Sequence, residues 1–143
     1  MKHTVKISTP WEAKCIGGQD VLRVRCDLPE ARSLVLALCL LREELVCSFV
    51  IPGHKGQKLE LVLDRERRIR PMLKWSGDGV EIGLSTVTVD MLINFYLIYH
   101  RDGLADVNHV DIETTTDGYL TFFAAETKPP RSRADFERLL LGQ

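Results

Sequence analysis

The alternation of apolar and polar positions is most informative between Gly79 and Ala125. An apolar run, GVEIGL, precedes a long apolar segment. Two stretches follow: residues 108–114, in which apolar and polar side chains alternate, and residues 119–125, in which both faces are rather apolar. Spacing of apolar residues by three and four predicts a helix, and strict alternation predicts a strand. The stretch is therefore predicted to form a strand, a helix, a strand, a tight hairpin turn at Asp117-Gly118 and a last strand.

The predicted helix runs from about Val89 to Arg101. Ser85, Thr86 and Thr88 are candidate N-caps, because a hydroxyl accepts hydrogen bonds from the free amides of a first turn. Gly103 supplies the left-handed residue at which helices commonly end. The segment therefore carries a start signal and a stop signal at a normal helix length.

Within this helix Asp90, Asn94 and Arg101 form a thin polar stripe. Asp90 is expected in the first turn, where the helix dipole favours a negative charge. A surface helix usually has a wider polar face. The pattern favours a helix buried in the core, with a second interpretation in which Tyr96 and Tyr99 are exposed to a partner.

A second helix is predicted from a cap at Asp27 to about Glu43. Asp27 and Glu30 have the spacing of a capping box, and Pro29 has the fixed φ that suits a first turn. Residues 34–41 are apolar throughout and also fit a buried strand. Polar residues at both ends favour the helix.

The fold class is predicted to be α+β, with a mostly antiparallel sheet of six to eight strands and two main helices packed on it. The strands between Leu45 and Leu84 are expected to form an antiparallel meander. Residues 1–143 are predicted to be a single domain, in which a polar linker at 127–132 leads to a short C-terminal helix. The residues expected to dock this helix are Phe136, Leu139 and Leu140.

Composition narrows the class of protein. The chain has 143 residues, of which 45% are hydrophobic and 27% charged, which is typical of a globular domain. No apolar run reaches the roughly 20 residues of a membrane span, and the N-terminus has no apolar signal segment. A cytoplasmic protein is expected. The four cysteines lack a C-x-x-C pair and are predicted to be free, mostly buried thiols without a zinc site: Cys15, Cys26, Cys39 and Cys47.

Charge is unevenly distributed, although the net charge is −1. Residues 102–126 contain six carboxylates and no Lys or Arg: Asp102, Asp106, Asp111, Glu113, Asp117 and Glu126. Residues 65–74 contain five basic residues against Glu66: Arg65, Arg67, Arg68, Arg70 and Lys74. The sequence therefore predicts an acidic region and a basic segment.

His109, Asp111 and Glu113 have the only spacing that suggests chemistry. Alternate residues of a strand project to one side, so these three could bind a metal or act as an acid–base group. The simpler interpretation is a solvated strand face. No phosphate-binding loop, nucleophile elbow or dinucleotide fingerprint is present, so no catalytic residue, cofactor or metal is predicted. The pI of about 6.4 argues against a nucleic-acid partner.

The stretch VEIGLSTVTVDMLINFYLIYHRDGLADVNHVDIE resembles small bacterial immunity proteins of contact-dependent growth inhibition and related polymorphic toxin systems. The resemblance covers residues 79–125 and implies a cytoplasmic, non-enzymatic protein that binds one cognate toxin domain. An acidic surface would complement a basic nuclease-type toxin. The expected partner-binding residues are Asp102, Asp106, Asp111, Glu113 and Asp117. The alternatives are a metal-dependent or acid–base enzyme that uses the strand face above, and a homo-oligomeric ligand-binding domain with exposed tyrosines.

Overall fold

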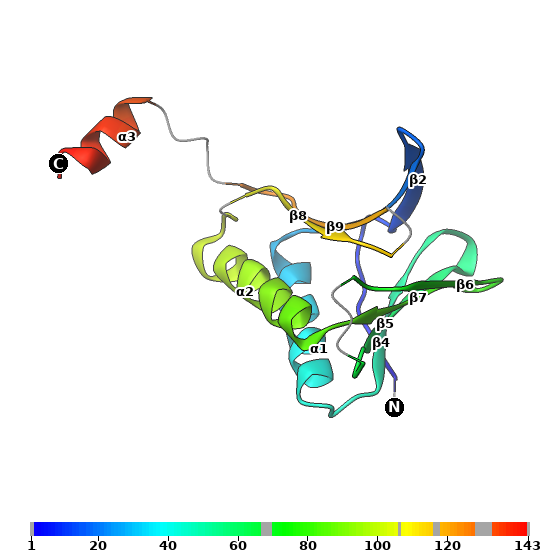
Figure 1. Cartoon of the computed structure of the whole chain (residues 1–143). Coiled ribbons are helices and arrows are strands. Elements are labelled where there is room, and N and C mark those ends of the chain that lie inside the picture. Colours follow the sequence, from blue (N-terminus) through cyan, green and yellow to red (C-terminus); the bar gives the residue numbers. More distant parts are fainter. Residues whose placement is uncertain (1, 67–69, 106, 116–117, 128–132, 143) are drawn as a thin grey trace.

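The computed structural model describes residues 2–66, 70–105, 107–115, 118–127 and 133–142. Within them the fold is α+β, with two long helices and nine strands that form two mixed sheets (Figure 1). The α+β class is therefore as predicted. The single, mostly antiparallel sheet is not, because the strands divide into two sheets with both parallel and antiparallel pairs.

The first sheet has five strands in the order β1-β4-β5-β7-β6. Their bounds are Lys2–Thr4, Ser48–Pro52, Lys58–Leu63, Gly79–Leu84 and Leu73–Ser76 in that order. β4 with β5 and β6 with β7 are antiparallel, whereas β1 with β4 and β5 with β7 are parallel. A one-turn 3-10 helix, η1, occupies His54–Gly56 between β4 and β5.

The second sheet has four strands in the order β2-β3-β9-β8. Their bounds are Glu12–Ile16, Gln19–Cys26, Tyr119–Ala124 and His109–Glu113 in that order. β3 and β9 are parallel, and the two outer pairs are antiparallel hairpins. The connection from β8 to β9 runs from Thr114 to Gly118, so it is longer than the predicted two-residue turn; Asp117 lies outside the described residues.

The predicted meander is wrong at one junction. β5 pairs with β7, not with β6, and the two run parallel. At this junction Gly79 has a φ of +142°, and a Cβ there would lie 1.9 Å from the carbonyl oxygen of Lys58. Only glycine combines that backbone conformation with so close an approach. Gly79, which the sequence marks as a turn residue, is therefore also needed for the parallel pairing of β5 with β7. The local sequence pattern does not reveal that pairing.

Helix α1, Leu28–Arg42, confirms the predicted start. Asp27 accepts from the Glu30 amide, and the Glu30 carboxylate accepts from the Asp27 amide, each at 2.9 Å. These two bonds are the reciprocal capping box. Residues 34–41 are helical, so the strand alternative for them is excluded.

Helix α2, Thr86–Asp102, begins earlier than predicted. The cap is Ser85, whose hydroxyl accepts from the Thr88 amide at 3.2 Å. Asp90 therefore lies beyond the first turn, and its carboxylate pairs with Arg42 of α1 at 2.9 Å. Gly103 ends the helix with a φ of 74°, as expected.

The core lies where α1 and α2 pack on each other and on the inner faces of both sheets (Figure 1). The central helix is buried as predicted, along the positions Val89, Leu92, Phe95, Tyr96 and Tyr99. Both tyrosines are 0% exposed, so the interpretation that shows them to a partner is wrong. Each hydroxyl finds an acceptor at depth: Tyr96 donates to the Phe123 carbonyl at 3.1 Å, and Tyr99 donates to the Glu126 carboxylate.

Residues 133–140 form a helical segment, α3, which Figure 1 draws apart from the helices and sheets. Leu140, one of its predicted docking residues, is 86% exposed. The side chains of Phe136 and Leu139, and linker residues 128–132, lie outside the described residues. In the described part of the chain, no helix is long and apolar enough to cross a membrane. Cys26 is buried, but Cys15 and Cys47 are exposed, which corrects the prediction of mostly buried thiols.

Candidate functional site

The second sheet has one face on the core and one face open to solvent. Residues at alternate positions of β3, β9 and β8 pack inward, and their neighbours point outward. We call the outward set the outer face. Its members are Arg23 and Arg25 on β3, Tyr119, Thr121 and Phe123 on β9, and His109, Asp111 and Glu113 on β8.

Phe123 contacts side chains from both neighbouring strands of the outer face. The register places Arg25 beside it on β3 and His109 beside it on β8. The Arg25 guanidinium carbon lies 4.3 Å from the ring centroid, that of Arg23 lies 5.9 Å away, and the His109 ring centroid is at 5.3 Å. Both arginine distances are within the range of a cation–π interaction. Phe123, Arg23, Arg25 and His109 together form what we call the Phe123 cluster.

Arg23 carries a donor without an acceptor. Its Nε atom is buried and has no hydrogen-bond partner among the described residues. A buried donor left unpaired costs roughly 1–3 kcal/mol. The Arg23 side chain lines a shallow depression of about 320 Å³, together with Tyr119, Thr121 and Asp111. An acceptor brought by a ligand or a partner would satisfy this donor.

The side chains of His109, Asp111 and Glu113 are all exposed on β8, as the alternation predicted. His109 Nε2 lies 3.4 Å from one Asp111 carboxylate oxygen, and Thr121 donates to the other at 2.6 Å. Glu113 instead pairs with Arg70 at 3.3 Å. Within the described residues, no group of three or more His, Cys, Asp or Glu is arranged to hold a metal ion.

Of the five predicted partner-binding residues, the structure brings Asp111 and Glu113 together on the outer face. Asp102 lies at the end of α2 and forms a two-pronged ion pair with Arg101, at 2.7 and 3.0 Å. Asp106 and Asp117 lie outside the described residues. The described carboxylates of the acidic region are thus a pair on β8, a third at the end of α2, and Glu126, which accepts from the Tyr99 hydroxyl.

The acidic region and the basic segment meet in the fold. Arg70 of the basic segment pairs with Glu113, and the Thr115 amide donates to the Pro71 carbonyl at 3.1 Å. Arg65 pairs with Glu44 at 2.7 Å. Arg67 and Arg68 lie outside the described residues. Part of the charge segregation in the sequence is therefore neutralised inside the molecule.

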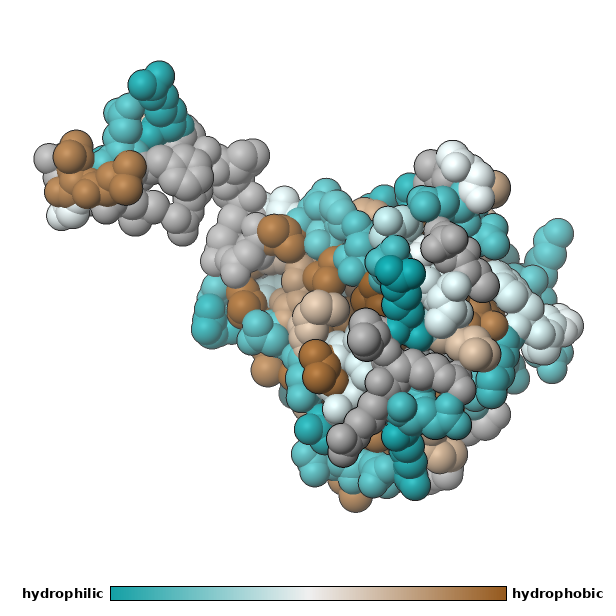
Figure 2. Space-filling view, viewed as in Figure 1, coloured by the Kyte–Doolittle hydropathy of each residue, from teal (hydrophilic) through white to brown (hydrophobic). Residues whose placement is uncertain are grey.

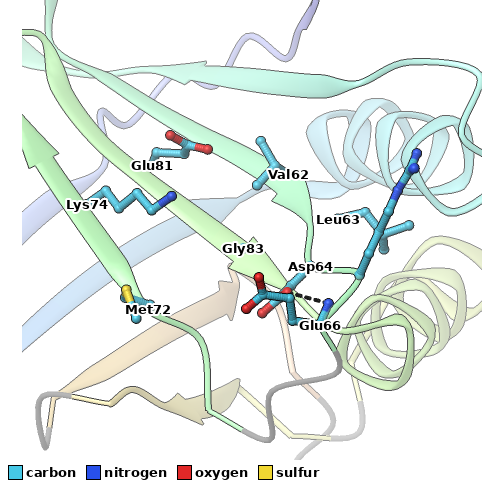
Figure 3. Close-up of a pocket in the computed structure, with 9 residues that line it drawn as sticks. Val62, Leu63, Asp64, Glu66, Met72, Lys74, Glu81 and Gly83 are labelled. Atoms are coloured by element: carbon cyan, nitrogen blue, oxygen red, sulfur yellow. Dashed lines mark hydrogen bonds between the residues drawn. The ribbon is translucent and has the colours of Figure 1, made fainter.

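A second depression, of about 310 Å³, lies on the outer side of the first sheet (Figure 3). Glu81 and Lys74 face each other there from β7 and β6, and the Asp64 carboxylate accepts from the Glu66 amide at 2.9 Å. Gly83 keeps the floor open, since a Cβ there would lie 3.2 Å from the Asp64 Cβ. Its described lining carries three carboxylates and two basic side chains, and no aromatic side chain.

The solvent side of α2 is a third surface. Val87, Met91 and Leu97 are exposed there, and Figure 2 shows apolar side chains over this helix interrupted by hydrophilic ones. The interruptions include Asp90 and Asn94, two members of the polar stripe that the sequence predicted. Scattered apolar residues of this kind are normal on a protein surface.

Three titratable groups with raised pKa values, Cys26, Tyr96 and Tyr99, lie under the second sheet, away from solvent. Burial raises the pKa of the Cys26 thiol to about 12, and Glu30 adds to the shift. Burial also raises the pKa values of Tyr96 and Tyr99. All three groups are therefore held in the neutral, protonated form, which suits a structural role and not acid–base catalysis at neutral pH.

The arginines of the outer face were missed at the sequence level. The alternation of VLRVRC places Arg23 and Arg25 on one side of a strand, but it does not say which strand lies next to them. The parallel pairing of β3 with β9 joins residues almost a hundred positions apart, and only that pairing brings Arg25 to Phe123. No local pattern carries this information.

No protein-family model matches the chain, and no curated protein matches it. Eight chains of solved structures do. One is a crystal structure of Drosophila Suppressor of Fused, with a TM-score of 0.44 and 13% sequence identity; the match covers 87% of this chain and 28% of that one. The present chain thus spans less than a third of that structure's length. The likeness is too distant to carry a function from one protein to the other.

Proposed function

We propose that this protein is an immunity protein that binds one cognate bacterial toxin domain and neutralises it. The observation that carries the proposal is the outer face of the second sheet. There, two carboxylates of the predicted binding set lie beside an aromatic side chain and two arginines, one of which has an unpaired buried donor. Aromatic residues and arginine are the residues most enriched among the energetic centres of protein interfaces.

The composition of this face favours a protein partner over a nucleic acid. Arg23 and Arg25 are balanced by Asp111 and Glu113, so the face has no net positive charge to attract phosphates. A protein surface can match both signs at once, with basic groups against the carboxylates and an acceptor against Arg23. A basic nuclease-type toxin domain is the partner class that the resemblance of residues 79–125 implies.

The test requires the toxin domain, which is expected to be encoded beside the gene of this protein. The parent protein should co-purify with that domain and protect cells that express it. Replacing both Asp111 and Glu113 by Lys should slow association about tenfold at low salt, because steering by opposite charges is removed, and should flatten the salt dependence.

The matched control reverses two carboxylates elsewhere, Asp78→Lys in the turn between β6 and β7 and Glu81→Lys on β7. It changes the net charge equally but leaves the outer face intact. If the parent binds the toxin and the two double variants lose association rate equally, only overall charge matters and the proposed face is wrong. If the parent neither binds nor protects, the proposed function itself fails.

A further inference from the structure

The backbone of β8 has a free side. β8 is at one edge of the second sheet and, in the part of the chain that the structure describes, it pairs with β9 alone. Two hydrogen bonds fix which of its positions bond to β9. The Ala124 amide donates to the Asn108 carbonyl at 3.0 Å, and the Thr114 amide donates to the Gly118 carbonyl at 2.9 Å.

Positions of an antiparallel pair alternate between those that exchange backbone hydrogen bonds and those that do not. Asn108 and Thr114 are bonded positions in one continuous register, so Val110 and Ile112 between them are bonded positions as well. The backbone N–H and C=O groups of His109, Asp111 and Glu113 must then point away from β9. This free edge carries the same three residues whose side chains lie on the outer face.

We propose that an extended segment of the partner adds to this edge as a further strand, with basic side chains facing Asp111 and Glu113. This inference rests on the proposed function and names how the partner is held. Strand addition supplies main-chain hydrogen bonds for affinity, while alternate side chains provide specificity. The edge is bounded at its far end, where the Thr115 amide already donates to the Pro71 carbonyl.

Charge decides between a basic segment and a second copy of this chain. In an antiparallel pairing of two copies that is centred on residue 111 or 112 of this edge, Asp111 would lie opposite the same residue or Glu113 of the second copy. Like charges directly opposite each other destabilise a strand pair, and opposite charges stabilise it. The carboxylates therefore disfavour self-association through this edge, as charged edge residues commonly do. They also attract a basic strand.

Proline provides a selective test, because it removes one backbone donor. Asp111→Pro removes an amide that points away from β9, so the pairing of β8 with β9 is spared; proline is tolerated at such edge positions. Asp111→Ala removes the same carboxylate but keeps the amide. If a strand adds here, Asp111→Pro should bind the toxin domain about tenfold more weakly than Asp111→Ala, which corresponds to one hydrogen bond of about 1.4 kcal/mol.

Ile112→Pro is the control for the geometry. The amide of Ile112 bonds to β9, so this variant should lose the pairing of β8 with β9. Its melting temperature should be well below that of Asp111→Pro. Equal binding by Asp111→Pro and Asp111→Ala, with both folded and the parent bound, overturns the inference and leaves the proposed function standing. Absence of binding by the parent overturns both.

If Asp111→Pro does not fold, amide hydrogen exchange of the parent protein tests the same inference. In the free protein the amides of His109, Asp111 and Glu113 should exchange fast, and those of Val110 and Ile112 slowly. In the complex the three fast amides should become protected by at least tenfold. Unchanged exchange at these three positions in a saturated complex shows that no strand has been added.

Discussion

The inner and outer faces of the second sheet are made from the same strands, yet they follow different rules. On the inner face, Leu120 and Phe122 are 0% exposed and pack with the two helices. On the outer face, the neighbours Thr121 and Phe123 lie among arginines, a histidine and carboxylates. The comparison separates positions that the fold requires from positions that the fold leaves available for binding.

Substitution of the consecutive residues Phe122 and Phe123 should give the largest difference between the two faces. Phe122 is fully buried, whereas Phe123 is half-buried on the outer face, so the two differ in environment but not in chemistry. Phe122→Ala should cost about 3–5 kcal/mol of unfolding free energy, because it leaves a cavity in the core. Phe123→Ala should cost about 1 kcal/mol or less, mainly the cation–π contacts.

Chemical denaturation of both variants measures these costs. Binding should show the reverse order: Phe123→Ala, although folded, should lose affinity for the toxin domain, because Phe123 is the aromatic side chain around which Arg23, Arg25 and His109 gather on the outer face. A loss of 3 kcal/mol or more for Phe123→Ala would mean that the outer face is needed for folding, and the contrast between the faces would disappear.

The contrast also marks what sequence could and could not predict. The inner positions repeat with the period of a strand or helix, so the helices, the capping box at Asp27 and the buried face of α2 follow from local pattern. The division into two sheets does not, because the pairings β1–β4, β5–β7 and β3–β9 join distant segments. Burial restricts the inner positions to apolar residues, so their pattern is visible in the sequence. The role of an outer residue depends on its neighbours on adjacent strands, which the sequence does not show.

Alkaline pH should lower the free energy of unfolding, because groups buried under the second sheet must stay protonated in the folded protein. The pKa of Cys26 rises from 9.0 to about 12 in the folded protein, so between these values the unfolded chain loses a proton that the folded protein keeps. Stability is then fully present below pH 9 and falls as the pH rises toward 12, by about 1.4 kcal/mol per pH unit for this group. Tyr96 and Tyr99 add to the fall above pH 10, because their pKa values are also raised.

Denaturation curves between pH 8 and 11.5 check this slope, and Cys26→Ala is the matched variant. Alanine removes the thiol, so the decline between pH 9 and 10 should become shallower even if the variant starts from a lower stability. An identical slope in parent and variant would show that the thiol is not protected from ionisation. The Cys26 thiol would then contribute nothing to the pH dependence of stability.

The smallest expected effect concerns the Arg70–Glu113 ion pair, and it bears most directly on why the carboxylates are where they are. The charged atoms are 3.3 Å apart, and each side chain is about half exposed, so solvent screens their attraction. A double-mutant cycle with Arg70→Ala and Glu113→Ala should give a coupling of about 0.2–1 kcal/mol, which shrinks in high salt. Such a value leaves Glu113 available, because a partner's basic group can replace Arg70 at little cost. A coupling well above 1 kcal/mol would instead make Glu113 part of the fold, and Asp111 would be the remaining acidic contact on the free edge of β8.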